Sequence, residues 1–262
     1  MLLEKFKAAK MPEVEALHAL AAADNMPLPL QGTRPDFLAA LKRPANGLDL
    51  AVIAEFKQAS PSRGIIIDTL NPEDVAEQYS HAGASCISVL TEHEFFGGEL
   101  AYLDRMSRLG TPLLRKDFIF DELQVQATAA TPASSLLLIV RLTPDADHLR
   151  RLRELAESHG IHAVVEIFDK TDLRIARESG ARIIQVNARD LDTLKTDRYI
   201  CLDLAQHKQN GEIWIAASAM DNADHLKSAK LAGYDAVLMG TALMEHGTPG
   251  NTLAHILSSY AS

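Results

Sequence analysis

Two oppositely charged residues stand close together at the end of a short apolar run. Glu55 and Lys57 follow residues 50–53, Leu-Ala-Val-Ile, a pattern typical of a buried strand. Because side chains alternate along a strand, Glu55 and Lys57 point to one face and Phe56 points to the other. A carboxylate and an ammonium are costly to bury unless they are paired or used in chemistry. The pair therefore marks a candidate site for acid–base catalysis.

Polar residues also stand at the ends of other apolar runs. Lys116 follows the run 112–114, Glu166 follows 163–165, and Asn187 and Arg189 follow 182–186. A single charged residue at such a place is more often an ordinary solvated side chain, and Asp117 is most simply a helix cap or the partner of a neighbouring arginine. What favours a site is that most of the predicted strands bring a polar group to their carboxyl end.

The apolar runs that carry these residues alternate with helical segments. Asn71 and Pro72 form a helix start signal, an N-cap followed by proline, and Gly83 stands where that helix should end. Eight alternating strand–helix units predict an α/β protein with an all-parallel sheet covered by helices. The predicted strands are 50–56, 86–90, 112–114, 135–140, 163–165, 182–186, 213–216 and 236–239.

A single (β/α)8 TIM barrel over residues 49–262 is the natural closure of this pattern, because barrels typically need about 250 residues. An open doubly wound sheet is the alternative, but no G-x-G-x-x-G turn follows the first strand. Residues 1–48 are expected to form a helical extension packed on the barrel, with helices at 2–23, interrupted near Pro12, and at 36–41. In a barrel, the carboxyl ends of the strands meet at one rim, so the polar residues should converge.

The last two predicted strands end in small residues, which suits phosphate binding. Ser218 and Ala219 follow the seventh strand, and Gly240 and Thr241 follow the eighth. Barrels commonly bind phosphate there through backbone N–H groups and the start of a short helix. Glycine lets the backbone approach the phosphate and the two hydroxyls add donors, whereas the Cβ atom of Ala219 restricts the loop.

Composition excludes several classes of protein. The net charge of -9 argues against a general nucleic-acid binder and against a basic membrane-surface protein. The two cysteines, Cys86 and Cys201, show neither metal-ligand spacing nor a disulfide framework, so we expect no metal site. No run approaches the roughly 18 apolar residues of a membrane span, and the N-terminus lacks a signal-peptide pattern. We expect a cytoplasmic protein.

Four motifs resemble those of the indole-3-glycerol phosphate synthase family of tryptophan biosynthesis. They are Ile-Ala-Glu-Phe-Lys-Gln-Ala-Ser-Pro-Ser at 53–62, Leu-Thr-Glu through Phe-Phe-Gly-Gly at 90–98, Leu-Arg-Lys-Asp-Phe at 114–118 and Val-Asn-Ala-Arg-Asp-Leu at 186–191. The resemblance covers nearly the whole chain. It implies a cofactor-free carboxy-lyase that cyclises 1-(2-carboxyphenylamino)-1-deoxyribulose 5-phosphate to indole-3-glycerol phosphate, with loss of carbon dioxide and water.

The resemblance also implies catalytic roles. Lys116 would be the general acid at the ketone oxygen, and Glu166 would be its partner in the later proton transfers. Lys57 would steer the anionic substrate and compensate its charge. Glu55 and Asn187 would hold the substrate hydroxyls and the lysines.

Further residues are expected to bind the two ends of the substrate. Arg189 and Ser60 suit the anthranilate carboxylate, since a guanidinium grips a carboxylate bidentately. Phe96 and Phe118 would wall the aromatic ring, with core packing as an equal alternative. The phosphate would bind at the small residues that follow the last two strands.

The chain departs from the family pattern at three places. Ala217-Ser218-Ala219 replaces the usual Glu-Ser-Gly, Gln185 replaces a usual glycine, and Pro132-Ala133-Ser134 replaces Gly-Ala-Asp. The first change touches phosphate binding, whereas the others are expected to alter turns and packing. Every proposed acid and base is present.

Two other functions are compatible with a phosphate-binding barrel. A catalytically weak or inactive barrel would bind a phosphorylated ligand or a partner subunit, but retention of the charged rim residues speaks against it. A related isomerase of the same pathway has no reason to keep the Lys-Asp-Phe and Ser-Pro-Ser stretches together. We therefore expect a small phosphorylated substrate, no nucleic-acid or membrane partner, and a monomer or weak homo-oligomer.

Overall fold

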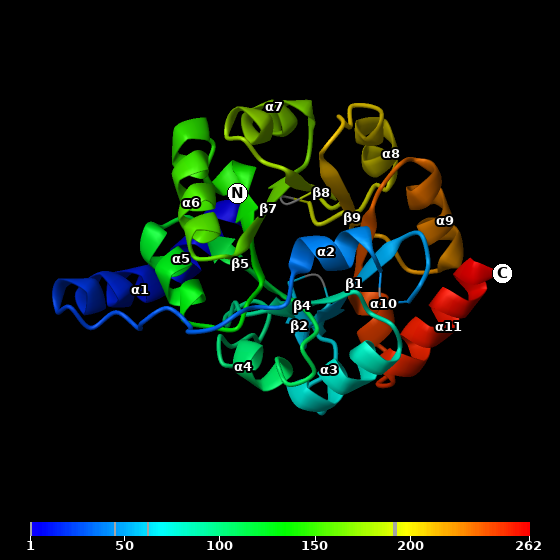
Figure 1. Ribbon diagram of the computed structural model, residues 1–262, viewed down its shortest axis with the longest axis horizontal. Coiled ribbons are helices and arrows are strands. Elements are labelled where there is room, and N and C mark those ends of the chain that lie inside the picture. The colour runs from blue at the N-terminus through cyan, green and yellow to red at the C-terminus, as the bar shows by residue number, and fades with distance from the viewer. Residues whose placement is uncertain (1, 45, 62, 191–192) are drawn as a thin grey trace.

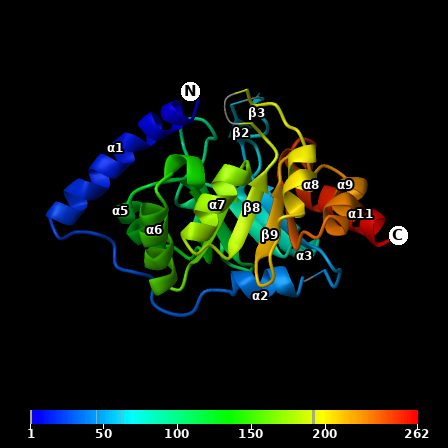
Figure 2. The same cartoon turned by 90° about the horizontal axis from the view of Figure 1, so that it is seen from above.

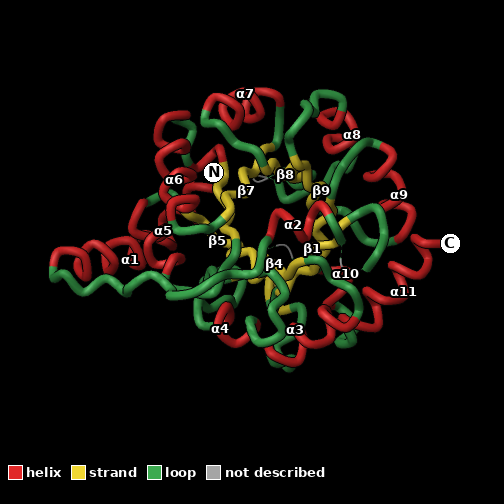
Figure 3. Tube along the Cα trace, viewed as in Figure 1, coloured by secondary structure: helices red, strands yellow, loops and turns green. Residues whose placement is uncertain are grey.

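Parallel strands close on one another into a barrel with helices around the outside (Figures 1 and 3). The computed structural model describes residues 2–44, 46–61, 63–190 and 193–262. The neighbour order around the barrel is β1-β10-β9-β8-β7-β6-β5-β4, so the TIM-barrel prediction is confirmed. The barrel strands are β1 (Ala51–Phe56), β4 (Cys86–Leu90), β5 (Leu113–Ile119), β6 (Ser135–Ile139), β7 (His162–Ile167), β8 (Ile183–Asn187), β9 (Ile213–Ala217) and β10 (Ala236–Met239).

The helices between the strands begin and end at the residues that signal such boundaries. Asp169 caps one of them by accepting a hydrogen bond from the backbone N–H of Asp172, and Gly83 follows another with a φ of 93°. These helices are α3 (Pro72–His81), α4 (Tyr102–Met106), α5 (Glu122–Ala129), α6 (Ala146–Ser158), α7 (Lys170–Glu178), α8 (Tyr199–Ala205), α9 (Ala223–Leu231), α10 (Thr241–Met244) and α11 (Pro249–Ala261), with a 3-10 turn η1 (Val140–Leu142) after β6.

Alternation along the strands separates two buried layers. In β1, Val52, Ala54 and Phe56 pack outward among the helices, where the ring of Phe56 meets Tyr102 edge-on at 5.6 Å. Ile53 instead belongs to the cluster inside the barrel. The strands are therefore buried on both faces, which explains why they read as continuous apolar runs.

The N-terminal helices cover the two ends of the barrel (Figure 2). α2 (Phe37–Lys42) lies across the end where the strands begin, and its Phe37 and Leu41 join the interior cluster. α1 (Leu2–Ala22) lies beside α5, with its first turns near the opposite end. The predicted interruption near Pro12 is wrong, because α1 continues through it. The division of the chain at residues 48 and 49 stays a prediction.

β5 extends well beyond the predicted run 112–114. Its last residues carry charges, but Arg115 and Asp117 are almost fully buried and paired with each other at 2.8 Å. Pairing removes the cost that would otherwise exclude charges from a buried strand. Lys116 is thus held by strand backbone and not by a loop, which fixes its direction. No helix in the described part of the chain has the length and apolar character of a membrane span.

Candidate active site

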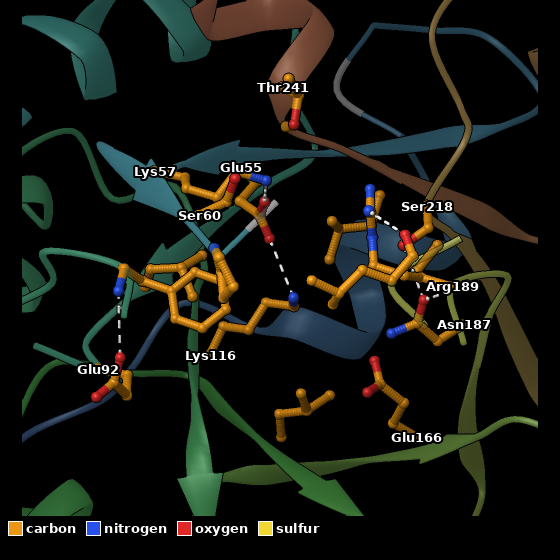
Figure 4. Close-up of a pocket in the computed structure, with 18 of the residues that line it drawn as sticks. Glu55, Lys57, Ser60, Glu92, Lys116, Glu166, Asn187, Arg189, Ser218 and Thr241 are labelled. Carbon is orange, nitrogen blue, oxygen red and sulfur yellow. Dashed lines mark hydrogen bonds and ion pairs between the residues drawn. The ribbon is translucent and has the colours of Figure 1, made fainter. Parts of the chain in front are cut away.

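A cavity of about 400 Å³ opens at the carboxyl ends of the strands (Figure 4). Its lining contains every residue that the sequence analysis predicted for the site. The structure thus brings together groups from β1, β5, β7 and β8 and from the segments that follow β1, β4, β8, β9 and β10. They are Glu55, Lys57, Ser60, Phe96, Lys116, Phe118, Glu166, Asn187, Arg189, Ser218, Ala219, Gly240 and Thr241.

Glu55 holds both lysines of the cavity. Its Oε1 lies 2.7 Å from Lys57 Nζ, and its Oε2 lies 3.3 Å from Lys116 Nζ. Burial alone would raise the pKa of Glu55, but the two ammonium groups outweigh it and lower the pKa to about 2. Glu55 is therefore a permanent anion that holds both lysine side chains in place.

Lys116 lies between two acidic side chains of the barrel interior. Burial tends to lower its pKa, but the carboxylates of Glu55 and Glu166 raise it above the ordinary value. Lys116 is therefore protonated at neutral pH and able to donate a proton. Its side chain remains partly accessible from the cavity, at 21% relative exposure, so a substrate can reach it.

The surroundings of Glu166 shift its pKa in the opposite direction from that of Glu55. It is 2% exposed, and burial raises its pKa, although Lys116 acts in the opposite direction. Its Oε2 accepts a hydrogen bond from Nε2 of Gln185. A buried carboxyl with a raised pKa takes up a proton at higher pH than a carboxyl such as Glu55, which suits it to proton transfer.

Asn187 ties the rim of β8 to the loop after β9. Its Oδ1 accepts hydrogen bonds from the backbone N–H of Arg189 at 3.0 Å and from Ser218 Oγ at 2.7 Å. Arg189 in turn donates from Nη1 to the backbone carbonyl of Leu194 at 2.9 Å. The guanidinium is thus oriented on one side of the cavity.

Aromatic rings form one wall of the cavity. Phe6 of α1 stacks on Phe118 with ring centroids 4.4 Å apart and planes inclined by 12°, and Phe96 lies 6.1 Å from Phe118. Phe6 lines the cavity but was missed in the sequence, where it reads as one apolar position of a helix. Only the placement of α1 reveals it.

The rim after β9 and β10 is tightly shaped. Ser218 and Ala219 both have left-handed backbone conformations, with φ of 67° and 55°, which side chains rarely adopt. The expected restriction at Ala219 is thus a real strain. Gly240 is required for a reason besides the predicted approach of the backbone to phosphate, because a Cβ atom there would lie 2.3 Å from Oε1 of Glu55.

Comparison with known proteins decides the family. The family model described as indole-3-glycerol phosphate synthase matches residues 3–256. The chain belongs to the indole-3-glycerol phosphate synthase family. An indole-3-glycerol phosphate synthase of Chloroherpeton thalassium is 41% identical over 251 residues, covering 92% of this chain and 94% of that protein. One of Campylobacter jejuni strain 81-176 is 40% identical over 223 residues, covering 85% of each.

Solved structures of low sequence identity support the fold alone. A 3-hexulose-6-phosphate synthase has a TM-score of 0.62 at 13% identity, covering 81% of this chain and 99% of that one. A deoxyribose phosphate aldolase from Aeropyrum pernix has a TM-score of 0.57 at 18% identity, covering 87% and 99%. The family assignment makes the chain a carboxy-lyase.

The family motif at 114–118 also anchors α1 to the barrel. Asp117 receives Lys10 Nζ from α1 at 3.0 Å, Arg115 Nη2 at 2.8 Å and the hydroxyl of Thr91 at 2.6 Å. Burial opposes ionisation of Asp117, but Arg115 and Lys10 lower its pKa to about 2. The prediction that Asp117 partners a neighbouring arginine is confirmed, and the partner in α1 was not foreseen.

The family motif at 90–98 supplies a further buried acid. Glu92 is 2% exposed and lines the cavity, and its carboxylate accepts backbone N–H groups of Glu94, Phe95 and Phe96 at 2.9, 2.8 and 3.2 Å. It therefore positions Phe96 and does not pair with a lysine. Ser62 and Leu191 of the quoted motifs lie outside the described residues. Within the described residues, no group of three or more acidic, histidine or cysteine side chains suits a metal ion.

Proposed function

We propose that the chain converts 1-(2-carboxyphenylamino)-1-deoxyribulose 5-phosphate to indole-3-glycerol phosphate, with Lys116 and Glu166 as its proton-transfer groups. One observation carries the assignment of these groups. Lys116 Nζ is held 3.3 Å from Glu55 in a cavity that also contains the buried Glu166 (Figure 4). Lys116 is thus a charged proton donor, and Glu166 in the same cavity is a carboxyl whose pKa is raised.

Ring closure is the first step. The aromatic carbon that bears the carboxylate attacks the ketone carbon, and the electron pair of the carbonyl bond moves to its oxygen. Lys116 donates a proton to that oxygen, so a hydroxyl forms in place of an alkoxide. The cavity places the two carbons together, which supplies much of the rate enhancement for an intramolecular closure.

Decarboxylation and dehydration complete the reaction. The carboxylate leaves as carbon dioxide, and its electron pair restores the aromatic ring. Lys116, recharged by a proton from solvent after ring closure, protonates the hydroxyl, which leaves as water, while the carbon beside the nitrogen loses a proton to Glu166. Glu166 then returns that proton to Lys116, so each turnover takes up one proton from solvent. Because Glu55 stays ionised, Lys116 is recharged readily.

Substrate binding follows the shape of the cavity. The rings of Phe96 and Phe118 form an apolar wall for the anthranilate ring, and Phe6 supports them from α1. We assign Arg189 and Ser60 to the anthranilate carboxylate. We assign the phosphate to Ser218, Ala219, Gly240 and Thr241, which line the cavity after β9 and β10, where barrels commonly bind phosphate through backbone N–H groups.

The test is turnover of the purified chain with this substrate. We expect indole fluorescence to rise, with one carbon dioxide released for each indole formed. A folded chain that gives no product would refute the proposal. Calorimetry in the same buffer then separates the remaining possibility, since substrate binding without turnover would identify a ligand-binding barrel.

We further propose that the chain works in the cytoplasm as a monomer or weak homo-oligomer on its phosphorylated substrate. All the residues that we assign to catalysis and binding lie together in one cavity of this chain. Light scattering across a concentration series tests the oligomeric state. A stable higher oligomer at low micromolar concentration would contradict it.

A further inference from the structure

We propose that Gln185 is a positioning residue whose side-chain amide holds the carboxylate of Glu166 in the orientation and charge state that proton abstraction needs. The inference rests on the proposed role of Glu166 as proton acceptor. From the sequence alone, Gln185 is expected to alter turns and packing. The structure instead places its amide against a reacting group.

Strand register brings the two side chains together. Glu166 of β7 and Gln185 of β8 are direct partners across the parallel ladder. Gln185 is fully buried, Glu166 is 2% exposed, and Nε2 of Gln185 donates a hydrogen bond to Oε2 of Glu166. The pairing of β7 with β8 therefore holds the side chains of Glu166 and Gln185 against each other.

The second polar atom of the Gln185 side chain indicates that the hydrogen bond to Glu166 is the main role of this amide. Oε1 of Gln185 is buried and has no hydrogen-bond partner among the described residues. An unpaired buried polar atom lowers the stability of the fold. An apolar side chain of the same size would avoid that cost and fill the same space. What it would lose is the hydrogen bond to Glu166.

Charged and polar groups from three other strands act on Glu166. Burial raises its pKa, and Lys116 of β5 lowers it. The amides of Gln185 and Asn187 on β8 also lower it, whereas Glu55 of β1 raises it. Removing the amide of Gln185 therefore leaves burial and Glu55 less opposed, so Glu166 should hold its proton to higher pH.

The test compares Gln185→Met with wild type, because methionine keeps the size of the side chain and removes the donor. Ile215→Val is the matched control, since Ile215 is the buried partner of Gln185 on β9 and carries no polar group. We expect Gln185→Met to lower kcat about tenfold with KM little changed, and to move the acidic limb of the kcat/KM profile up by about one pH unit. Ile215→Val should leave that limb in place.

A second readout does not depend on turnover. The carboxyl carbon of Glu166, assigned with Glu166→Gln, is titrated by NMR in glutamate-labelled wild type and Gln185→Met. A higher pKa in the variant supports the inference, and an unchanged pKa overturns it. If wild type makes no product, the proposed function fails, while this titration still decides the role of Gln185.

Discussion

A Cβ atom on Gly240 would lie 2.3 Å from Oε1 of Glu55. β10 and β1 are neighbours in the barrel, with Met239 paired to Ala54, so the end of one strand directly borders the carboxylate of the other. Gly240 therefore leaves room for the carboxylate of Glu55, in addition to its proposed role at the phosphate. Glu55 can hold Lys57 and Lys116 in this position because residue 240 has no side chain.

Gly240→Ala should displace Glu55 and separate it from its lysines. Overpacking of this kind costs about 1–3 kcal/mol of stability. We expect kcat to fall at least tenfold because Lys116 loses its orientation. Glu55→Asp shortens the acid and makes room, so the double variant should be more stable to urea than the sum of the single changes predicts. Strict additivity would show that the two residues do not compete for space.

Ala219→Gly should relieve the strain of the loop after β9. The φ of Ala219 is 55°, which glycine adopts at no steric cost. We expect the free energy of unfolding to rise by up to about 1 kcal/mol, and KM to fall severalfold because the backbone can close on the phosphate. Ala217→Gly, at the end of β9, is the matched control and should destabilise the protein. An unchanged KM in Ala219→Gly would refute the phosphate-loop assignment.

The strand rhythm and the rim residues could be predicted because both are local properties of the sequence. Each predicted strand lies within a residue or two of an observed one, except that β5 continues to Ile119. That extension depends on Lys10 and Arg115 neutralising Asp117, a contact across 107 positions for Lys10 that no local pattern contains. The same reason hid Phe6 from the site, because only the packing of α1 places it at the cavity. Long-range packing decided both.

Phe6→Ala should weaken substrate binding through the aromatic wall. Phe6 is 2% exposed and stacks on Phe118, so its removal opens the cavity beside the anthranilate ring. We expect KM to rise about tenfold or more, with a stability loss of about 3 kcal/mol. Leu17→Ala on the same helix is the control, because Leu17 is buried but does not line the cavity. An equal rise of KM in both variants would mean that α1 matters only as a whole.

Acid should destabilise the fold through Glu55 and Asp117. Both have pKa values lowered to about 2 by their cationic partners, from ordinary values of 4.5 and 3.8. A carboxyl whose pKa is lowered by folding stabilises the folded state at pH values above its unfolded-state pKa. This stability is lost as the pH falls through the folded-state pKa, so the loss lies between about pH 4.5 and 2. Urea unfolding across this range should show a shallower decline for Asp117→Asn. Glu15→Gln, at an exposed position of α1, should keep the wild-type decline.

Lys116 and Lys57 offer the sharpest separation of catalysis from binding, because one carboxylate holds both. Lys57 Nζ lies 2.7 Å from Oε1 of Glu55, and Lys116 Nζ lies 3.3 Å from Oε2. Glu166 also raises the pKa of Lys116, so Lys116 has a second acidic neighbour for a proton cycle. Lys116→Ala should lower kcat by about 10²–10⁴ with an unchanged circular dichroism spectrum.

Lys57→Ala removes the same charge from the same partner. On the proposed assignment, in which Lys57 attracts the anionic substrate and transfers no proton, it should mainly raise KM. Steady-state kinetics of the two variants side by side measure this split directly. Equal losses of kcat would show that Lys116 acts only as a charge, and the general acid would then have to be sought elsewhere on the rim.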